Sequence, residues 1–245
     1  MTYCVGLRLN RGLLFMSDTR TNAGVDNIST FRKMQTWQGE GRFLTLLSSG
    51  NLATTQAVVS HLEERTKAAE DRSPSILEQP SMFQAALTVG ECLRETIARQ
   101  KGEGQKAAST TPFNATLILG GQIEPGPPRL FLIYPEGNFI EASDDTPFFQ
   151  IGETKYGRPI LVRAYDPDMS FEAAIKLLLV SFDSTIKANL SVGLPLDLLT
   201  YEADSYAPGE ERRIEADDPY FAQVSEGWGE ALKNALESLP DFVLD

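Results

Sequence analysis

The sequence predicts an α+β fold in which two antiparallel β-sheets lie face to face between layers of helices. Three observations predict it: short strands come in blocks, amphipathic helices separate those blocks, and glycine-bearing turns join consecutive strands. The chain has 245 residues, a length that suits one large layered domain over residues 1–245 better than two small domains.

The first fifty residues are predicted to form four strands in quick succession. Residues 3–9 alternate between two faces, and an Asn-Arg-Gly turn follows them. Connections this short favour antiparallel pairing. The predicted strands cover residues 3–9, 13–16, 31–37 and 42–49, with turns at 10–12 and 39–41 and a loop at 22–27.

Two helices follow this block. Asn51 is a typical N-cap, and apolar residues recur at helical spacing over residues 52–70. A polar link containing prolines leads to a second amphipathic helix over 81–99. Its predicted buried face contains Phe83, Ala86, Leu87, Cys92 and Ile97. Residues 100–111, rich in Lys, Gly, Ser and Thr, predict an exposed loop.

The second half repeats the order of strands and helices. Ser170 is the predicted N-cap of a strongly amphipathic helix, and the chain ends in another helix. Strands are predicted at 113–119, 130–134, from 139 onward, at 194–201 and at 211–215. Helices are predicted from 171 onward and at 219–239, and a short helix or loop at 158–164.

Charge and composition exclude several classes of protein. The net charge is -12, from 34 acidic and 22 basic side chains, which argues against nucleic-acid binding. The first residues do not resemble a secretory signal, and no window approaches the ~18 apolar residues of a membrane span. Cys4 and Cys92 lie in apolar periodic segments, which favours buried thiols over a disulfide. We therefore expect a cytoplasmic protein that binds neither nucleic acid nor membrane.

The single histidine, His61, limits the possible chemistry. It lies in a helical pattern with no nucleophile motif nearby, so a Ser-His-Asp or Cys-His arrangement is disfavoured. One His without a Cys-x-x-Cys motif cannot form a two-histidine zinc site. We expect neither a metal nor another cofactor.

The N-terminal strands carry a hydroxyl, a carboxylate and an ammonium on Thr2, Asp18 and Lys33. We hypothesise that removal of Met1 frees the Thr2 α-amine, which has a pKa near ~7.7 and can act as base for the hydroxyl of its own residue. Lys33 would stabilise the alkoxide, and Asp18 would orient Lys33. Gly50, between a strand and a helix, is the candidate backbone donor to an oxyanion.

Each of these residues also has a purely structural interpretation. Many proteins have a small residue such as Thr2 after the initiator Met. Asp18 could cap the turn that ends its strand, and Lys33 could be a solvated strand residue. Gly50 could be an ordinary turn glycine. The four residues therefore indicate a catalytic site only in combination.

Together these residues resemble the N-terminal half of a proteasome β-type subunit. The resemblance rests on Thr2, SDTRT at 17–21, FRKM at 31–34 and SSGN at 48–51, and NLSVGLPLDLL at 189–199 narrows it to bacterial members. It implies the four-layer αββα sandwich of N-terminal-nucleophile hydrolases, with Thr2 as nucleophile. It also implies polypeptide substrates, homo-oligomeric rings or open spirals and, by analogy, an ATP-dependent unfoldase.

The later part of the chain departs from the family pattern, in which an Asp and a Ser brace the site. Asn189 stands where the Asp is expected and can orient a neighbour but supplies no charge. Ser191 is the candidate for the Ser, and Gly152-Glu153-Thr154 lacks the serine usual at that place. The residues predicted to line the substrate cleft are Arg20, Thr21 and Ser48.

The sequence therefore favours a threonine-type endopeptidase subunit. Two alternatives stay open. One is a catalytically silent scaffold of the same fold, in which Met1 masks Thr2, and the other is an amidase that acts on a small molecule. The D-T-R-T motif and the lysine that follows it favour the peptidase.

Overall fold

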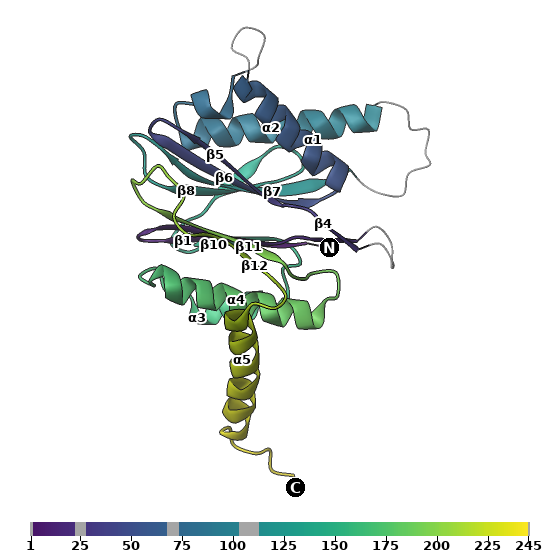
Figure 1. The fold of residues 1–245 in the computed structure, drawn as a ribbon, viewed down its shortest axis with the longest axis vertical. Coiled ribbons are helices and arrows are strands. Elements are labelled where there is room, and N and C mark those ends of the chain that lie inside the picture. Colours follow the sequence, from purple (N-terminus) through teal and green to yellow (C-terminus); the bar gives the residue numbers. More distant parts are fainter. Residues whose placement is uncertain (1, 23–27, 68–73, 103–112, 245) are drawn as a thin grey trace.

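Four layers stack in the order helix, sheet, sheet, helix in the computed structural model, which describes residues 2–22, 28–67, 74–102 and 113–244 (Figure 1). This arrangement confirms the predicted α+β sandwich. One sheet has the order β5-β6-β7-β8-β9, and helices α1 and α2 cover it. The bounds are β5 Met34–Gly39, β6 Arg42–Gly50, α1 Leu52–Lys67, η1 Ile76–Glu78, α2 Met82–Gly102, β7 Ala115–Ile123, β8 Arg129–Ile133 and β9 Phe139–Glu141.

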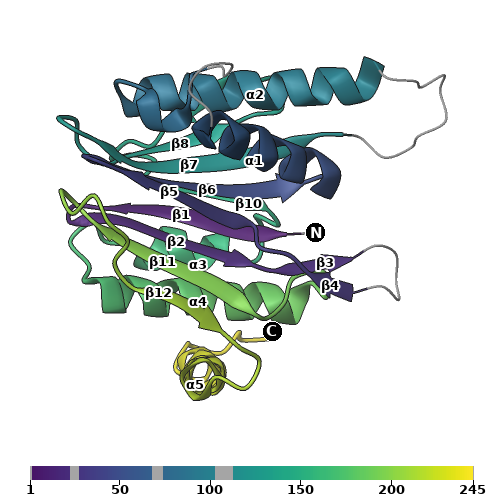
Figure 2. The same cartoon turned by 45° about the horizontal axis from the view of Figure 1, so that its top comes forward.

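The other sheet has the order β10-β1-β2-β11-β12, and helices α3 and α4 cover it (Figure 2). All its pairings are antiparallel, so the start of β1 and the end of β2 lie side by side, with Cys4 opposite Ser17. The bounds are β1 Tyr3–Leu9, β2 Gly12–Asp18, β10 Phe148–Gly152, α3 Arg158–Ala164, α4 Phe171–Ala188, β11 Leu196–Glu202 and β12 Glu211–Ile214.

Both faces of β1 are buried, which explains why the strand is apolar at most positions. The Tyr3 face packs on the helical layer, where its ring lies 4.4 Å from that of Phe182 between centroids. The Cys4 face packs against the second sheet. Burial raises the pKa of the Cys4 thiol far above its ordinary value, so this buried thiol is unreactive.

The two sheets approach closely at Gly6. A Cβ added at this glycine would lie 2.9 Å from side-chain carbons of both Ile118 and Leu130 in the facing sheet. A larger residue here would push the sheets apart. Gly6 therefore helps to fix the distance between the sheet that carries Thr2 and the sheet that ends at Gly50.

The structure corrects the predicted elements in several places. Lys33 does not lie within a strand. It is the last residue of the segment 31–33, which connects β4 to β5 and is not part of a strand. A two-stranded ribbon, β3 (Arg20–Asn22) with β4 (Ile28–Thr30), and strand β10 were not predicted. Phe83 is exposed, with Met82 buried in its place. Residues 23–27, 68–73 and 103–112 of the predicted loops, link and helix end lie outside the described residues.

Helix α5 (Pro219–Glu237) extends away from the four layers (Figure 1). Its first turns pack on the helical layer through Phe221 and Val224. Its apolar side then continues into solvent at Leu232 and Leu236, which are 50% and 72% exposed. Across the described residues, none of the helices combines the length and apolar character that crossing a bilayer requires.

Candidate active site

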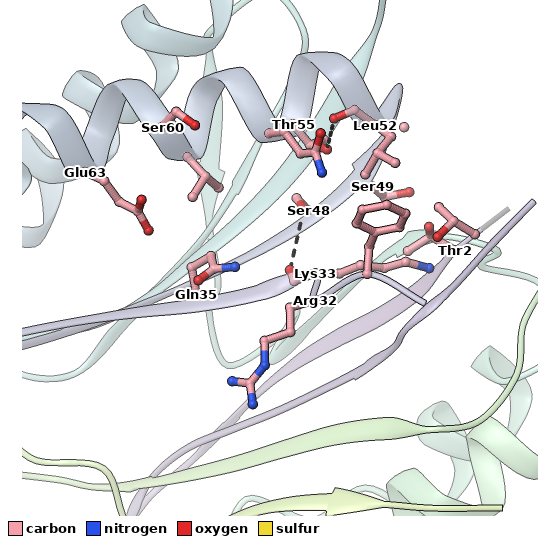
Figure 3. Close-up of a pocket in the computed structure, with 15 residues that line it drawn as sticks. Thr2, Arg32, Lys33, Gln35, Ser48, Ser49, Leu52, Thr55, Ser60 and Glu63 are labelled. Atoms are coloured by element: carbon pink, nitrogen blue, oxygen red, sulfur yellow. Dashed lines mark hydrogen bonds between the residues drawn. The ribbon is translucent and has the colours of Figure 1, made fainter. Parts of the chain in front are cut away.

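A pocket of about 440 Å³ opens between the edge of the two sheets and helix α1 (Figure 3). Thr2, Lys33 and Gly50, which come from three segments of the sequence, all line it. In Figure 3 the Lys33 side chain extends toward Thr2 at one end of the pocket, and Glu63 lies at the other end. The remaining lining residues are Thr21, Phe31, Arg32, Gln35, Ser48, Ser49, Leu52, Thr55, Gln56, Val59 and Ser60.

A buried ion pair connects Lys33 to Asp18 behind the pocket. Lys33 Nζ donates to Asp18 Oδ1 at 2.7 Å and to the Arg20 carbonyl at 2.6 Å. The same Asp18 oxygen accepts from the backbone N–H of Tyr3 at 3.0 Å. The side chains of Lys33 and Asp18 are only 5% and 0% exposed. One carboxylate oxygen therefore fixes the ammonium beside the backbone of the N-terminal strand.

The electrostatics of this pair follow from its burial. Burial raises the pKa of the Asp18 carboxyl above its ordinary value, and the charge and hydrogen bond of Lys33 oppose the shift. Because each charge is buried, each needs the other to offset the loss of hydration. The pair is therefore a fixed feature of the site rather than a flexible surface contact.

The backbone of Thr2 is fixed by the last residue of β10 and by the residue that follows it. Its carbonyl accepts a hydrogen bond from the Glu153 N–H at 2.6 Å. Gly152, opposite Tyr3, has a φ of +85°, and a Cβ there would lie 1.9 Å from the Thr2 carbonyl oxygen. Only glycine allows this approach and this backbone conformation. Thr2 itself is 8% exposed and faces the pocket.

Gly50 also depends on the absence of a side chain. Its φ is +120°, and a Cβ would lie 2.4 Å from the Asn114 carbonyl oxygen. Asn51 caps the following helix, because its Oδ1 accepts from the Thr54 N–H at 3.1 Å. The end of β6 and the positive end of the α1 dipole therefore meet at the pocket.

The other predicted residues divide into two groups. Thr21 and Ser48 line the pocket. Arg20 does not, because its guanidinium donates to the Leu190 carbonyl at 2.9 Å and lies against Gly193. The charge of Arg20 therefore supports the loop after α4 instead of facing the cleft.

Asn189 and Ser191 lie in that loop and do not line the pocket. The Asn189 amide donates to Glu153 Oε2 at 3.0 Å, and its oxygen accepts from the Ser191 N–H at 3.0 Å. Asn189 thus orients a neighbour by hydrogen bonding, as its chemistry allows. Ser191 makes this contact through its backbone N–H and not through its hydroxyl.

Sequence reasoning missed the contribution of α1 to the pocket. The lining residues of this helix recur three or four positions apart, from Leu52 through Val59 to Glu63. This is the spacing of one helix face. That face mixes apolar, hydroxyl and carboxylate groups, and this mixture could have indicated from the sequence that the helix lines a pocket. Among the residues that the structure describes, no group of His, Cys, Asp and Glu could hold a metal ion.

The arrangement suits attack on a carbonyl carbon. A hydroxyl, an adjacent ammonium and a strand-to-helix glycine converge on one pocket, and a carboxylate holds the ammonium from behind. Such a set can lower the pKa of the hydroxyl and bind negative charge that develops on a carbonyl oxygen. The direct proton acceptor would be the Thr2 nitrogen, provided that it is a free amine.

Comparisons with known proteins agree with this geometry. The profile of the proteasome subunit family matches residues 2–194. None of the curated proteins matches the chain. Among solved structures, the chain is 49% identical to the Anbu (Gly-1) mutant from Hyphomicrobium sp. strain MC1, with both chains fully covered and a TM-score of 0.90.

Two further structures come from other bacteria. Anbu (ancestral beta-subunit) from Yersinia bercovieri is 48% identical, with 99% of this chain and 100% of that chain covered and a TM-score of 0.90. The helical assembly of the Anbu complex from Pseudomonas aeruginosa is 45% identical, with 98% of each chain covered and a TM-score of 0.89. The chain therefore belongs to the proteasome subunit family, and relatives that match it over its full length include Anbu, or ancestral β-subunit, proteins.

Proposed function

We propose that the protein is a cytoplasmic threonine peptidase subunit that hydrolyses peptide bonds after removal of Met1. The Thr2 hydroxyl is the nucleophile, the Thr2 α-amine accepts its proton, and Lys33 stabilises the alkoxide. Asp18 positions Lys33, and the Gly50 backbone N–H is the oxyanion donor. Thr21 and Ser48 contact the substrate, and an ATP-dependent unfoldase is the expected supplier of extended polypeptide.

The observation that carries this proposal is the position of Lys33. Its Nζ is buried, shares Asp18 Oδ1 with the Tyr3 N–H, and extends toward Thr2 in a pocket open to solvent. A lysine that only stabilised the fold would not need to line a pocket with a hydroxyl. Membership of the proteasome subunit family supports the same chemistry.

The first test is the state and reactivity of Thr2. We expect the intact mass of the protein from its native cells to lack Met1, and a peptide vinyl sulfone to alkylate the Thr2 hydroxyl. Thr21 is an internal control, because it lines the same pocket but has no adjacent amine. A mass that retains Met1 together with no labelling of Thr2 would contradict the proposal and favour the scaffold function.

We also propose that the protein assembles with copies of itself. The relative from Pseudomonas aeruginosa is described as a helical assembly. In this chain the apolar side of α5 continues beyond its contact with the helical layer, and the exposed residues after it extend the same character. These exposed residues are Leu232, Leu236, Leu239, Phe242, Val243 and Leu244. A soluble protein rarely leaves such a run uncovered, so a second copy is the proposed cover.

Leu236→Glu is expected to dissociate this assembly. Covering one leucine contributes about 1.5–3 kcal/mol per contact, and a carboxylate in the same place adds a desolvation cost. Native mass spectrometry and sedimentation should show smaller species. Asn234→Glu on the same helix makes a matched control, since Asn234 is exposed and polar. Equal assembly of both variants would place the contact elsewhere.

A further inference from the structure

Glu153 directly follows β10 and lies opposite Thr2. The pairing of β1 with β10 places Tyr3 opposite Gly152, and the hydrogen bond from Glu153 N–H to Thr2 O, 2.6 Å long, continues this register by one residue. The position of Glu153 is thus tied to that of Thr2.

The Glu153 side chain is buried and held by neutral donors. The residue is 8% exposed, and its two carboxylate oxygens accept from the Lys155 N–H and from the Asn189 amide, both at 3.0 Å. Within the described ranges, no Lys, Arg or His side chain forms an ion pair with it. Lys33, the buried cation that lines the pocket with Thr2, is already paired with Asp18.

A buried carboxylate without a counter-charge is costly, so such groups are normally paired. In a chain that begins at Thr2, the α-ammonium is a new cation on the residue to which Glu153 is hydrogen-bonded. We propose that the Glu153 carboxylate is the counter-ion of the Thr2 α-ammonium and positions it, with Asn189 holding the carboxylate in place. This inference rests on the proposed role of Thr2.

The pairing has a consequence for the proton acceptor. A carboxylate favours the protonated amine, whereas the nearby Lys33 favours the neutral amine. The balance between Glu153 and Lys33 then sets the pH at which the amine becomes a base. Glu153 touches no reacting atom in this scheme, so it is a positioning residue and not a catalytic one.

The test is a titration of the Thr2 amine in protein that begins at Thr2, verified by intact mass. Acetic anhydride labels the neutral amine, and the extent of labelling at each pH is read from the N-terminal peptide by mass spectrometry. We expect the midpoint in Glu153→Gln to fall by about one pH unit. Glu136→Gln, at an exposed turn, is the control and should leave the midpoint unchanged.

A swapped pair separates charge from structure. Glu153→Gln combined with Asn189→Asp keeps one amide and one carboxylate in exchanged order, and it should return the midpoint toward that of the parent. Should Glu153→Gln fail to fold, Glu153→Ser removes the same charge with a smaller side chain and carries the same expectation.

Equal midpoints in the parent and in a folded charge-removing variant would overturn the inference, as would a swapped pair that stays at the lowered midpoint. The amine titration does not depend on turnover. Absence of turnover in all variants would therefore count against the proposed function and would leave the assignment of Glu153 to be decided by the midpoints.

Discussion

Thr2→Ala is expected to lower turnover of a peptide substrate by at least about a thousandfold, because no other hydroxyl has the same position and the same adjacent amine. The measurement is kcat/KM with a fluorogenic peptide, in protein whose N-terminus is verified by mass. Binding and assembly should persist, since the Thr2 carbonyl that pairs with Glu153 is part of the backbone.

Thr2→Ser is the matched control for this change. It keeps the hydroxyl and the amine and removes only a methyl group, so much of the activity should remain. If Thr2→Ala is as active as the parent, the nucleophile lies elsewhere. Activity lost equally in Thr2→Ala and Thr2→Ser would instead indicate that residue 2 acts through packing.

Lys33→Met is expected to reduce both activity and stability. It leaves the Asp18 carboxylate buried without its cation, and breaking a buried pair in this way costs about 3–5 kcal/mol. For a chain of this length the melting temperature should fall on the order of 10 °C. Arg11→Met is the comparison, because Arg11 pairs with Glu202 at 3.1 Å but both side chains are 43% or more exposed. That variant should lose less than about 1 kcal/mol.

The stability lost in Lys33→Met should depend on pH. Without Lys33, only backbone hydrogen bonds from Tyr3 and Gly193 oppose the effect of burial on Asp18, so its pKa in the folded state rises further above the unfolded value. The folded state then holds the Asp18 proton more tightly than the unfolded state does. The variant should therefore be closest to the parent below the ordinary pKa of Asp and lose stability as the pH rises through the raised value.

Replacing both members of the pair tests whether the loss comes from the orphaned charge. Asp18→Leu combined with Lys33→Met should recover much of the stability, because no buried charge is left unpaired. It should not recover turnover, because the ammonium beside Thr2 is still absent. If the double variant is as unstable as Lys33→Met, the stability loss comes from changed packing of the two side chains and not from an unpaired charge.

The fold class was predictable because the strands and helices of each layer have recognisable local sequence patterns. Strand alternation, the Asn51 cap and the Ser170 cap depend on residues close in the chain, and the structure confirms both caps. Strand β10 was missed because burial on both faces removes the alternation that reveals a strand. Phe83 was predicted to be buried but is exposed, because it lies at the edge of the apolar side of its helix. Sequence spacing alone does not decide whether a residue at that edge is buried.

The sequence by itself determined the helix-sheet-sheet-helix order and the family, and it predicted Thr2, Asp18, Lys33 and Gly50 as the candidate site, because local spacing and a sharp motif carry these features. Only the tertiary structure decided that Arg20 supports a loop and that the carboxylate beside Asn189 is Glu153. These contacts join residues far apart in the chain, and the packing of the two sheets, not local spacing, brings them together.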